Sequence, residues 1–278
     1  MSRDKRMDRR TDRPAGAHAD EIKACCAAAY ASDWARLLLG ESFHPGGLAL
    51  TERLGTLLDL RPGKRILDVA AGQGTSAIFL AQRFGCEVTG VEYGGDLVCT
   101  AARAAEEALV ADRVRFEQGD AEHLPFAGGQ FDAVICECAF CTFPNKPAAA
   151  REFARALRLG GSIGLTDLTR SGEVPAELQG LLAWIACIAD ALSVDEYVHH
   201  LANAGLTVER IELHDQALST LVQDVRTRLL GAEFLVKLKH IDLPSVDFEQ
   251  AKSMARAAAE AVKAGRFGHA LIIAMKRC

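Results

Sequence analysis

Cysteine side chains recur where they could act together on one chemical group. Cys136, Cys138 and Cys141 fall in one short segment, and Cys25 is followed directly by Cys26. The first 20 residues are charged and lack the apolar stretch of a secretory signal, so we expect a cytoplasmic protein, in which disulfides are rare. Thiolates select soft, thiophilic centres. The cysteines therefore favour a site for such a centre, although a single buried cysteine is more often a small hydrophobe.

A second group of residues suits a nucleoside. The segment DVAAGQGT, from Asp68 to Thr75, follows an apolar run, and its small residues let the backbone turn close to a ligand while the next helix presents free N–H groups. Glu92, beside Tyr93, ends the next apolar run at the spacing of an acid that accepts hydrogen bonds from ribose. Asp120 follows one run later, beside Ala121, where a carboxylate meets the adenine amino group. The three features in this order favour nucleoside binding.

The elements that would position these residues alternate between strands and helices. Apolar residues recur at helical spacing from 20 to 60, with a break at Pro45–Gly47, and short apolar strands separated by helices follow. We expect strands at 65–70, 87–93, 113–121, 131–140, 162–168, 207–215 and 269–276, and helices at 94–111, 148–157, 177–191, 194–205, 221–240 and 248–265. This alternation predicts an α/β fold, with a mostly parallel sheet covered on both faces.

The composition predicts one globular unit with additions. We expect a disordered tail at 1–20, a helical segment at 21–60, a nucleoside-binding core at 61–170, and an extension at 171–278 that completes the sheet and the substrate site. The net charge of -5 disfavours nucleic acid as a partner, because phosphate binding needs a basic face. No apolar run approaches the roughly 20 residues that span a bilayer. A small-molecule substrate is therefore favoured over nucleic acid or membrane.

Residues 60–170 resemble the class I S-adenosylmethionine-dependent methyltransferases. LDVAAGQGT resembles their first motif, GVEY the second, GDAEHLPF the third, FDAVICECAF the fourth, and LRLGGSIGLTDL the strand after it. The resemblance implies a Rossmann-like, doubly wound sheet that binds S-adenosylmethionine. The cofactor residues it implies are Asp68, Ala70, Gly72, Gly74, Glu92, Tyr93, Asp120, Ala121 and Glu137. Ala70 departs from the family, which usually has its first glycine there. A dinucleotide dehydrogenase is disfavoured, because no second glycine-rich unit appears.

The chemistry of methyl transfer limits the class of acceptor that the site suits. A sulfonium gives up its methyl group in an in-line displacement with a neutral leaving group, so the protein mainly positions a lone pair. Oxygen and nitrogen acceptors usually need a base, and only His123 and Glu137 are candidates beside the site. Trivalent arsenic bound by thiolates keeps a lone pair and carries no proton. If the fourth strand stays extended, Cys136 and Cys138 share one face beside the methyl group.

Three segments resemble the arsenite methyltransferases. ICECAFCTFPNK resembles the segment whose cysteine, at the place of Cys138, binds arsenic, and WIACIADALS resembles the one that would make Cys187 a second ligand. Ala24-Cys25-Cys26 resembles a patch that supplies a third thiol, with Cys25 and Cys26 both open as the ligand. The resemblance implies that arsenite or methylarsenite enters as a thiol conjugate and is detoxified by successive methylations. Glutathione or thioredoxin would be the reductant.

Two other functions remain open. The same fold could methylate an oxygen, nitrogen or carbon of an organic molecule, in which case serine at Cys138 and Cys187 would leave turnover nearly intact. A thiol-based metalloid-binding protein without catalysis would bind arsenite and consume no S-adenosylmethionine. A zinc site at 136–141 is disfavoured, because the cysteine spacing is too tight for the usual paired clusters. The turn Ser42–Gly47 could close over the cofactor or simply connect two helices.

Overall fold

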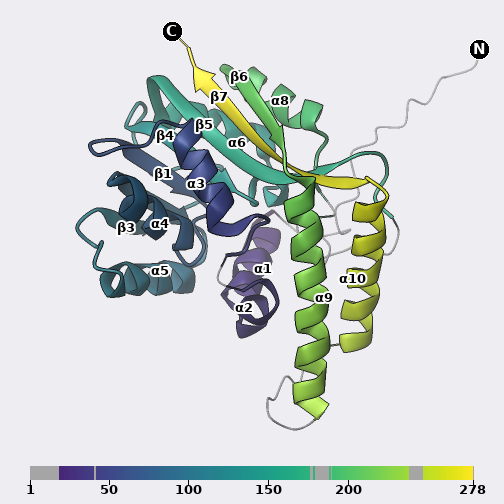
Figure 1. Ribbon diagram of the computed structural model, residues 1–278. Helices are drawn as coiled ribbons and strands as arrows, with labels where there is room; N and C mark the ends of the chain where they lie inside the picture. Colours follow the sequence, from purple (N-terminus) through teal and green to yellow (C-terminus); the bar gives the residue numbers. More distant parts are fainter. Residues whose placement is uncertain are drawn as a thin grey trace, which may run out of the picture.

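The computed structural model describes residues 19–40, 42–175, 178, 188, 190–237 and 247–277 (Figure 1). They form a seven-stranded sheet in the order β3-β2-β1-β4-β5-β7-β6. The strands are β1 (Arg65–Val69), β2 (Glu87–Glu92), β3 (Val114–Gln118), β4 (Phe131–Glu137), β5 (Leu157–Arg170), β6 (Leu206–Leu213) and β7 (Phe267–Lys276). Neighbours among β1 to β5 pair in parallel, and β7 pairs antiparallel with both β5 and β6. The predicted mostly parallel, Rossmann-like sheet is confirmed.

Helices cover both faces of this sheet (Figure 1). They are α3 (Gly47–Leu57), α4 (Thr75–Phe84) and α5 (Gly95–Glu107) on one face, and α6 (Lys146–Ala156) and α8 (Val194–Asn203) on the other. Successive residues of β1 point to opposite layers, so Ile66 packs with α3 and α4 while Leu67 packs with α6 and α8. Burying an apolar side chain of this size contributes about 1.5–3 kcal/mol. The two apolar layers hold the strands in register and thereby fix their carboxyl ends.

Local signals explain where several helices begin. Ser193 and Glu196 form a reciprocal capping box at the start of α8, in which each side chain accepts a hydrogen bond from the other's backbone N–H. Asn145 caps α6 with its side chain, which accepts a hydrogen bond from Ala148 N. Such caps satisfy backbone donors that the helix cannot pair internally.

The remaining helices lie at the carboxyl end of the sheet. They are α1 (Ala19–Ala31) and α2 (Asp33–Leu39), and then α9 (Asp215–Lys237) and α10 (Phe248–Lys263), which lie side by side and project from the sheet (Figure 1). Arg228 of α9 donates to Leu38 O over 3.0 Å and so joins the projecting pair to α2. Across the described ranges, no helix has the length and apolar character needed to cross a membrane. The helix expected at 177–191 falls almost wholly outside the described residues.

Two expected strands are clearly shorter than the sequence suggests: the one expected at 113–121 is β3 (Val114–Gln118), and the one expected at 131–140 is β4. The apolar run 131–140 predicts ten strand residues, but β4 ends at Glu137 and a 3₁₀ turn, η1 (Phe140–Thr142), follows. Cys138 between them has a φ of 53°, in the left-handed region. An extended strand cannot pass through this conformation, so the chain changes direction at Cys138.

Candidate functional site

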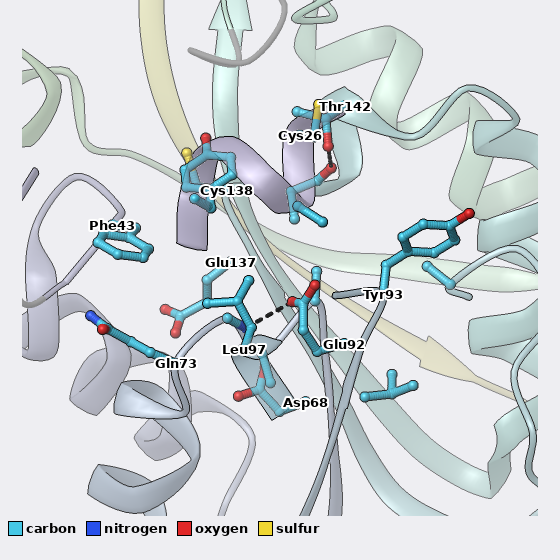
Figure 2. A pocket seen from close by; sticks show the side chains of 18 of the residues that line it. Cys26, Phe43, Asp68, Gln73, Glu92, Tyr93, Leu97, Glu137, Cys138 and Thr142 are labelled. Atoms are coloured by element: carbon cyan, nitrogen blue, oxygen red, sulfur yellow. Dashed lines mark hydrogen bonds between the residues drawn. The ribbon is translucent and has the colours of Figure 1, made fainter. Parts of the chain in front are cut away.

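A pocket opens at the carboxyl ends of β1, β2 and β4, beneath α1 (Figure 2). It contains about 1140 Å³ not filled by atoms, part of it open to solvent. Open α/β sheets bind their ligands at this edge, outside the carboxyl ends of the strands. The predicted residues that line it are Asp68, Ala70, Gly72, Glu92, Tyr93, Asp120, Ala121, Glu137, Cys138 and Cys26.

The turn after β1 has the strained backbone that its small residues suggest. Ala70 has a φ of 59°, Gly72 of 56° and Gly74 of 85°. A left-handed alanine costs about 1–2 kcal/mol, so Ala70 holds a conformation that glycine would adopt without strain. Gly74 does not line the pocket but begins α4, where a Cβ atom would lie 2.5 Å from the Phe116 ring. Its role is therefore close packing between helix and sheet.

Glu92 closes this turn from the neighbouring strand. Its Oε2 accepts a hydrogen bond from Gly72 N over 3.0 Å, and its Oε1 accepts one from Gly94 N over 3.1 Å. Burial raises the pKa of Glu92, and the backbone donors oppose part of that rise. Each carboxylate oxygen keeps lone-pair capacity toward the pocket, where ribose hydroxyls could donate.

Asp68 is the most deeply buried carboxyl group of the pocket. Among the described residues, its Oδ2 atom has no hydrogen-bond partner, and the residue is 3% exposed. Burial, and then the negative charges of Glu137 and Glu92, raise its pKa well above the ordinary range. Leaving such an atom unpaired costs about 1–3 kcal/mol, so the geometry fits a ligand that brings a donor or a positive charge.

Glu137 is held by side chains that the sequence did not single out. Its carboxylate accepts hydrogen bonds from Thr51 Oγ1 at 3.1 Å and from Ser76 Oγ at 2.5 Å, and His44 Nε2 lies 3.6 Å from Oε2. His44 belongs to the turn Ser42–Gly47 and, with Phe43, lines the pocket. The turn therefore forms part of the wall. The sequence around Thr51 and His44 does not predict their contact with Glu137, because this contact forms only in the folded chain.

Some of the cysteines line the pocket, and others are buried in the apolar core. Cys138 lines the pocket while its N–H donates to Thr166 O over 2.7 Å, whereas Cys136 is fully buried in the apolar layer beneath α6. A shared face required a strand that stays extended through Cys138, and this condition is not met, because β4 ends at Glu137 and Cys138 has a left-handed φ. Burial raises the pKa of Cys136 well above the ordinary range, so it remains a thiol. Cys141 is also fully buried.

The N-terminal segment contributes a second pocket thiol. Of the adjacent cysteines, both described, Cys26 lines the pocket and Cys25 does not. Figure 2 shows Cys26 and Cys138 on the side of the pocket opposite Asp68. Cys187 lies outside the described residues. Within the described ranges, no three His, Cys, Asp or Glu side chains are arranged to hold a metal ion.

The core of the chain matches a known domain. Residues 66–161 match the family described as a methyltransferase domain. The chain is 35% identical to a 27-O-demethylrifamycin SV methyltransferase from Amycolatopsis mediterranei over 59% of this chain and 61% of that protein. It is 28% identical to an arsenite methyltransferase from Aquipseudomonas alcaligenes over 83% of this chain and 71% of that protein. The match with the first relative thus covers less than two thirds of that relative's length.

The fold has solved counterparts. The structure of a putative sarcosine dimethylglycine methyltransferase from Galdieria sulphuraria superposes with a TM-score of 0.77 at 20% identity, covering 90% of this chain and 98% of that one. At this identity the likeness establishes the fold. It confirms the predicted Rossmann-like fold, and the domain match of residues 66–161 supports the predicted cofactor, S-adenosylmethionine. The relatives thus include arsenite methyltransferases and also methyltransferases named for other small molecules.

Proposed function

Because residues 66–161 form a methyltransferase domain, we propose that this protein transfers the methyl group of S-adenosylmethionine to trivalent arsenic held by cysteine thiolates. The substrate is arsenite or methylarsenite. One observation carries the proposal: Cys26 and Cys138, far apart in sequence, line the same pocket as Asp68 (Figure 2). Two thiols beside a nucleoside-type site suit a thiophilic acceptor.

The carboxylates at the carboxyl ends of the strands fit the cofactor. S-adenosylmethionine supplies a methyl group on a positively charged sulfur, and it also carries an ammonium group. Asp68, with its buried unpartnered oxygen, accepts from the ammonium group, while Glu92 accepts from the ribose hydroxyls and Asp120 from the adenine amine. Glu137 adds negative charge beside them. Methyltransferase structures of similar fold that hold this cofactor or its demethylated product support the assignment.

The thiols hold the acceptor. Cys138 and Cys26 displace thiols from an arsenic–thiol conjugate, and the proton of each cysteine leaves with the displaced thiolate. The arsenic lone pair forms a bond to the methyl carbon as the carbon–sulfur bond of the donor breaks, and that electron pair stays on sulfur. Arsenic thereby becomes pentavalent and positively charged. Two thiols of glutathione or thioredoxin then supply two electrons by becoming a disulfide and release two protons. One sulfur ligand leaves the arsenic with the electron pair and takes up one of these protons, which restores the trivalent state. No step requires a base from the protein.

Cys187 is proposed as a third thiol on sequence resemblance alone. Cys26 is preferred to Cys25 because it is the one of the pair that lines the pocket. The arsenite methyltransferase relative, which aligns with 83% of this chain, supports the choice of substrate.

An organic acceptor is the second candidate, and a specific contact favours it. His44 Nε2 lies 3.6 Å from Glu137 Oε2 in the pocket wall, and Thr51 lies beside both. A histidine oriented by a carboxylate is a common proton acceptor, which a hydroxyl or amine substrate would need. The 35% identity to an O-methyltransferase points the same way.

The deciding experiment supplies methyl-labelled S-adenosylmethionine with arsenite and glutathione, and separates the products by arsenic species. We expect labelled methylarsenic from the wild type. Cys138→Ser and Cys26→Ser should abolish it, while Cys99→Ser, which changes an exposed cysteine of α5, should leave it unchanged. A parallel set of reactions offers small phenols and amines. Labelled organic products, with Cys138→Ser fully active, would overturn the arsenic proposal and leave the methyltransferase proposal standing.

A further inference from the structure

The side chain of Lys23 crosses from α1 to two carboxylates on the adenine side of the pocket. Its Nζ lies 2.7 Å from Asp120 Oδ2 and 2.7 Å from Glu122 Oε2. The Lys23 side chain is 9% exposed and that of Glu122 is 5% exposed. Burial lowers the pKa of Lys23, but the hydrogen bonds to both carboxylates outweigh it and the net pKa is raised. The ammonium group therefore stays charged inside the protein.

Both carboxylates are fixed by backbone donors. Asp120 Oδ1 accepts from Glu122 N over 2.9 Å, and Glu122 Oε1 accepts from Asn145 N over 2.6 Å. Asn145 is the residue that caps α6. Lys23 thus attaches α1 to a rigid part of the sheet-and-helix core, rather than to flexible surface acids.

The same face of α1 carries the pocket thiol. Lys23, Cys26, Ala27 and Tyr30 follow helical spacing, and all four line the pocket. Further along this face, Ala27 lies against Gly94, where a Cβ would come within 3.2 Å of it, and the Tyr30 ring lies 5.7 Å from that of Phe43. Lys23 anchors the first half of the helix, and these contacts locate the second half.

We infer that Lys23 is a positioning residue that couples cofactor binding to the placement of the Cys26 thiol. Asp120 is the carboxylate assigned to the adenine amine, and its oxygens have lone pairs for both the amine and Lys23. A bound adenine fixes Asp120 further, Asp120 holds Lys23, and Lys23 holds the helix that presents Cys26. The inference rests on the cofactor part of the proposed function and is independent of the acceptor.

The experiment measures the alkylation rate of Cys26 and the affinity for S-adenosylhomocysteine. In a Cys25→Ser background, iodoacetamide labelling of Cys26 is followed by peptide mass spectrometry, with and without S-adenosylhomocysteine. Affinity is measured by calorimetry. The variants are Lys23→Met, which removes the charge, Lys23→Arg, which keeps it, and Glu122→Gln, which weakens the second partner. The matched control is Lys252→Met, since Lys252 bridges Glu233 and Glu249 at 3.0 and 2.6 Å outside the pocket.

In the parent protein, we expect S-adenosylhomocysteine to slow alkylation about tenfold, as expected when a charged hydrogen bond restrains the helix. Lys23→Met should reduce this protection to less than about twofold and weaken ligand affinity about tenfold. Glu122→Gln should reproduce the loss of protection, Lys23→Arg should restore most of it, and Lys252→Met should resemble the parent.

Unchanged protection in Lys23→Met, or tighter ligand binding, would overturn the inference, because tighter binding would make Lys23 a competitor of adenine. The arm without ligand tests the anchor separately: Cys26 should react faster in Lys23→Met than in Lys23→Arg, and equal rates would overturn it. A parent protein that binds no S-adenosylhomocysteine would contradict the proposed function itself, and the ligand-free arm would still report on the anchor.

Discussion

The two sides of the pocket are built in different ways. On the cofactor side, Asp68 and Glu92 stand at the ends of adjacent parallel strands, and Glu92 is fixed by backbone N–H groups of nearby turns. On the thiol side, Cys138 occupies a strained turn and Cys26 arrives on a helix that a buried ion pair attaches to the core. The cofactor side depends on the sheet, whereas the thiol side depends on contacts between segments far apart in sequence.

Because of this difference, substitutions on the two sides should affect the stability of the fold to different degrees. The sheet residues are surrounded by two apolar layers, so altering the cofactor side also tests packing. Substitutions of the thiols themselves should change acceptor chemistry and leave the cofactor bound, whereas the helix that carries Cys26 is attached through Lys23 to Asp120 on the cofactor side. The predictions below use this contrast, from the largest effect to the smallest.

The largest effect should come from removing one of the two pocket thiols that we propose as arsenic ligands. In a Cys25→Ser background, Cys138→Ser should weaken binding of phenylarsine oxide by about 10²–10⁴-fold, because a two-point attachment becomes a single one. Calorimetry with the arsenical measures this. Cys136→Ser, in the buried layer of the same strand, should lower stability while keeping the affinity. Equal loss in both variants would show that the two cysteines are not separated as the pocket and core positions imply.

A smaller effect is expected on the cofactor side. Asp68→Asn removes the charge but keeps the size, and it should weaken binding of S-adenosylmethionine about tenfold to 100-fold, since a hydrogen bond to a charged group contributes about 1.5–3 kcal/mol. Binding of phenylarsine oxide should be unaffected, because the thiols lie on the opposite side of the pocket. Simultaneous loss of arsenical binding would show that Asp68 also supports the thiols, which the contacts join to the cofactor side through Lys23 and Asp120 only.

Much of the cofactor side could be predicted because its signals are local. Asp68, Glu92 and Asp120 each follow an apolar strand, and parallel strands bring their carboxyl ends together. The left-handed turn at Gly72 and Gly74 could also be predicted, because glycine adopts a positive φ without strain. The order of β1 to β5 was not predicted, because right-handed strand–helix–strand connections are compatible with more than one strand order.

The thiol side could be predicted only in part. Cys138 and Cys26 were candidates by resemblance, but the sequence left open whether Cys136 shares a face with Cys138, because nothing in ICECAF marks the left-handed residue. Lys23 and Thr51 went unnoticed, and His44 was considered only as part of the turn Ser42–Gly47, since each acts through a partner far away in the chain. Contacts of this kind depend on how helices dock on the sheet, which hydrophobic periodicity does not determine.

A third prediction tests the glycine turn through stability. Gly74→Ala should lower the free energy of unfolding by about 2–5 kcal/mol, which combines the cost of a left-handed alanine with overlap of its Cβ and the Phe116 ring. Gly63→Ala is the control, because its φ is also positive, at +83°, yet no described atom lies within 4 Å of the added Cβ. It should cost only about 1–2 kcal/mol. Urea unfolding measures both, and equal losses would remove the packing role of Gly74.

The smallest effect is a pH dependence that belongs to the cofactor side alone. Burial, and then Glu137 and Glu92, raise the pKa of Asp68 well above its ordinary value, so in the ligand-free protein this carboxyl keeps its proton to a higher pH than an exposed aspartate does. A positively charged ligand favours the carboxylate, so binding releases that proton and the affinity for S-adenosylmethionine rises with pH until the ligand-free group is ionised. Above that point the dependence disappears. Calorimetry in buffers of different ionisation enthalpy measures the release, and Asp68→Asn should remove most of it. Affinity that falls as pH rises would mean that Asp68 is already ionised before the cofactor arrives, and then its unpartnered oxygen would need another explanation.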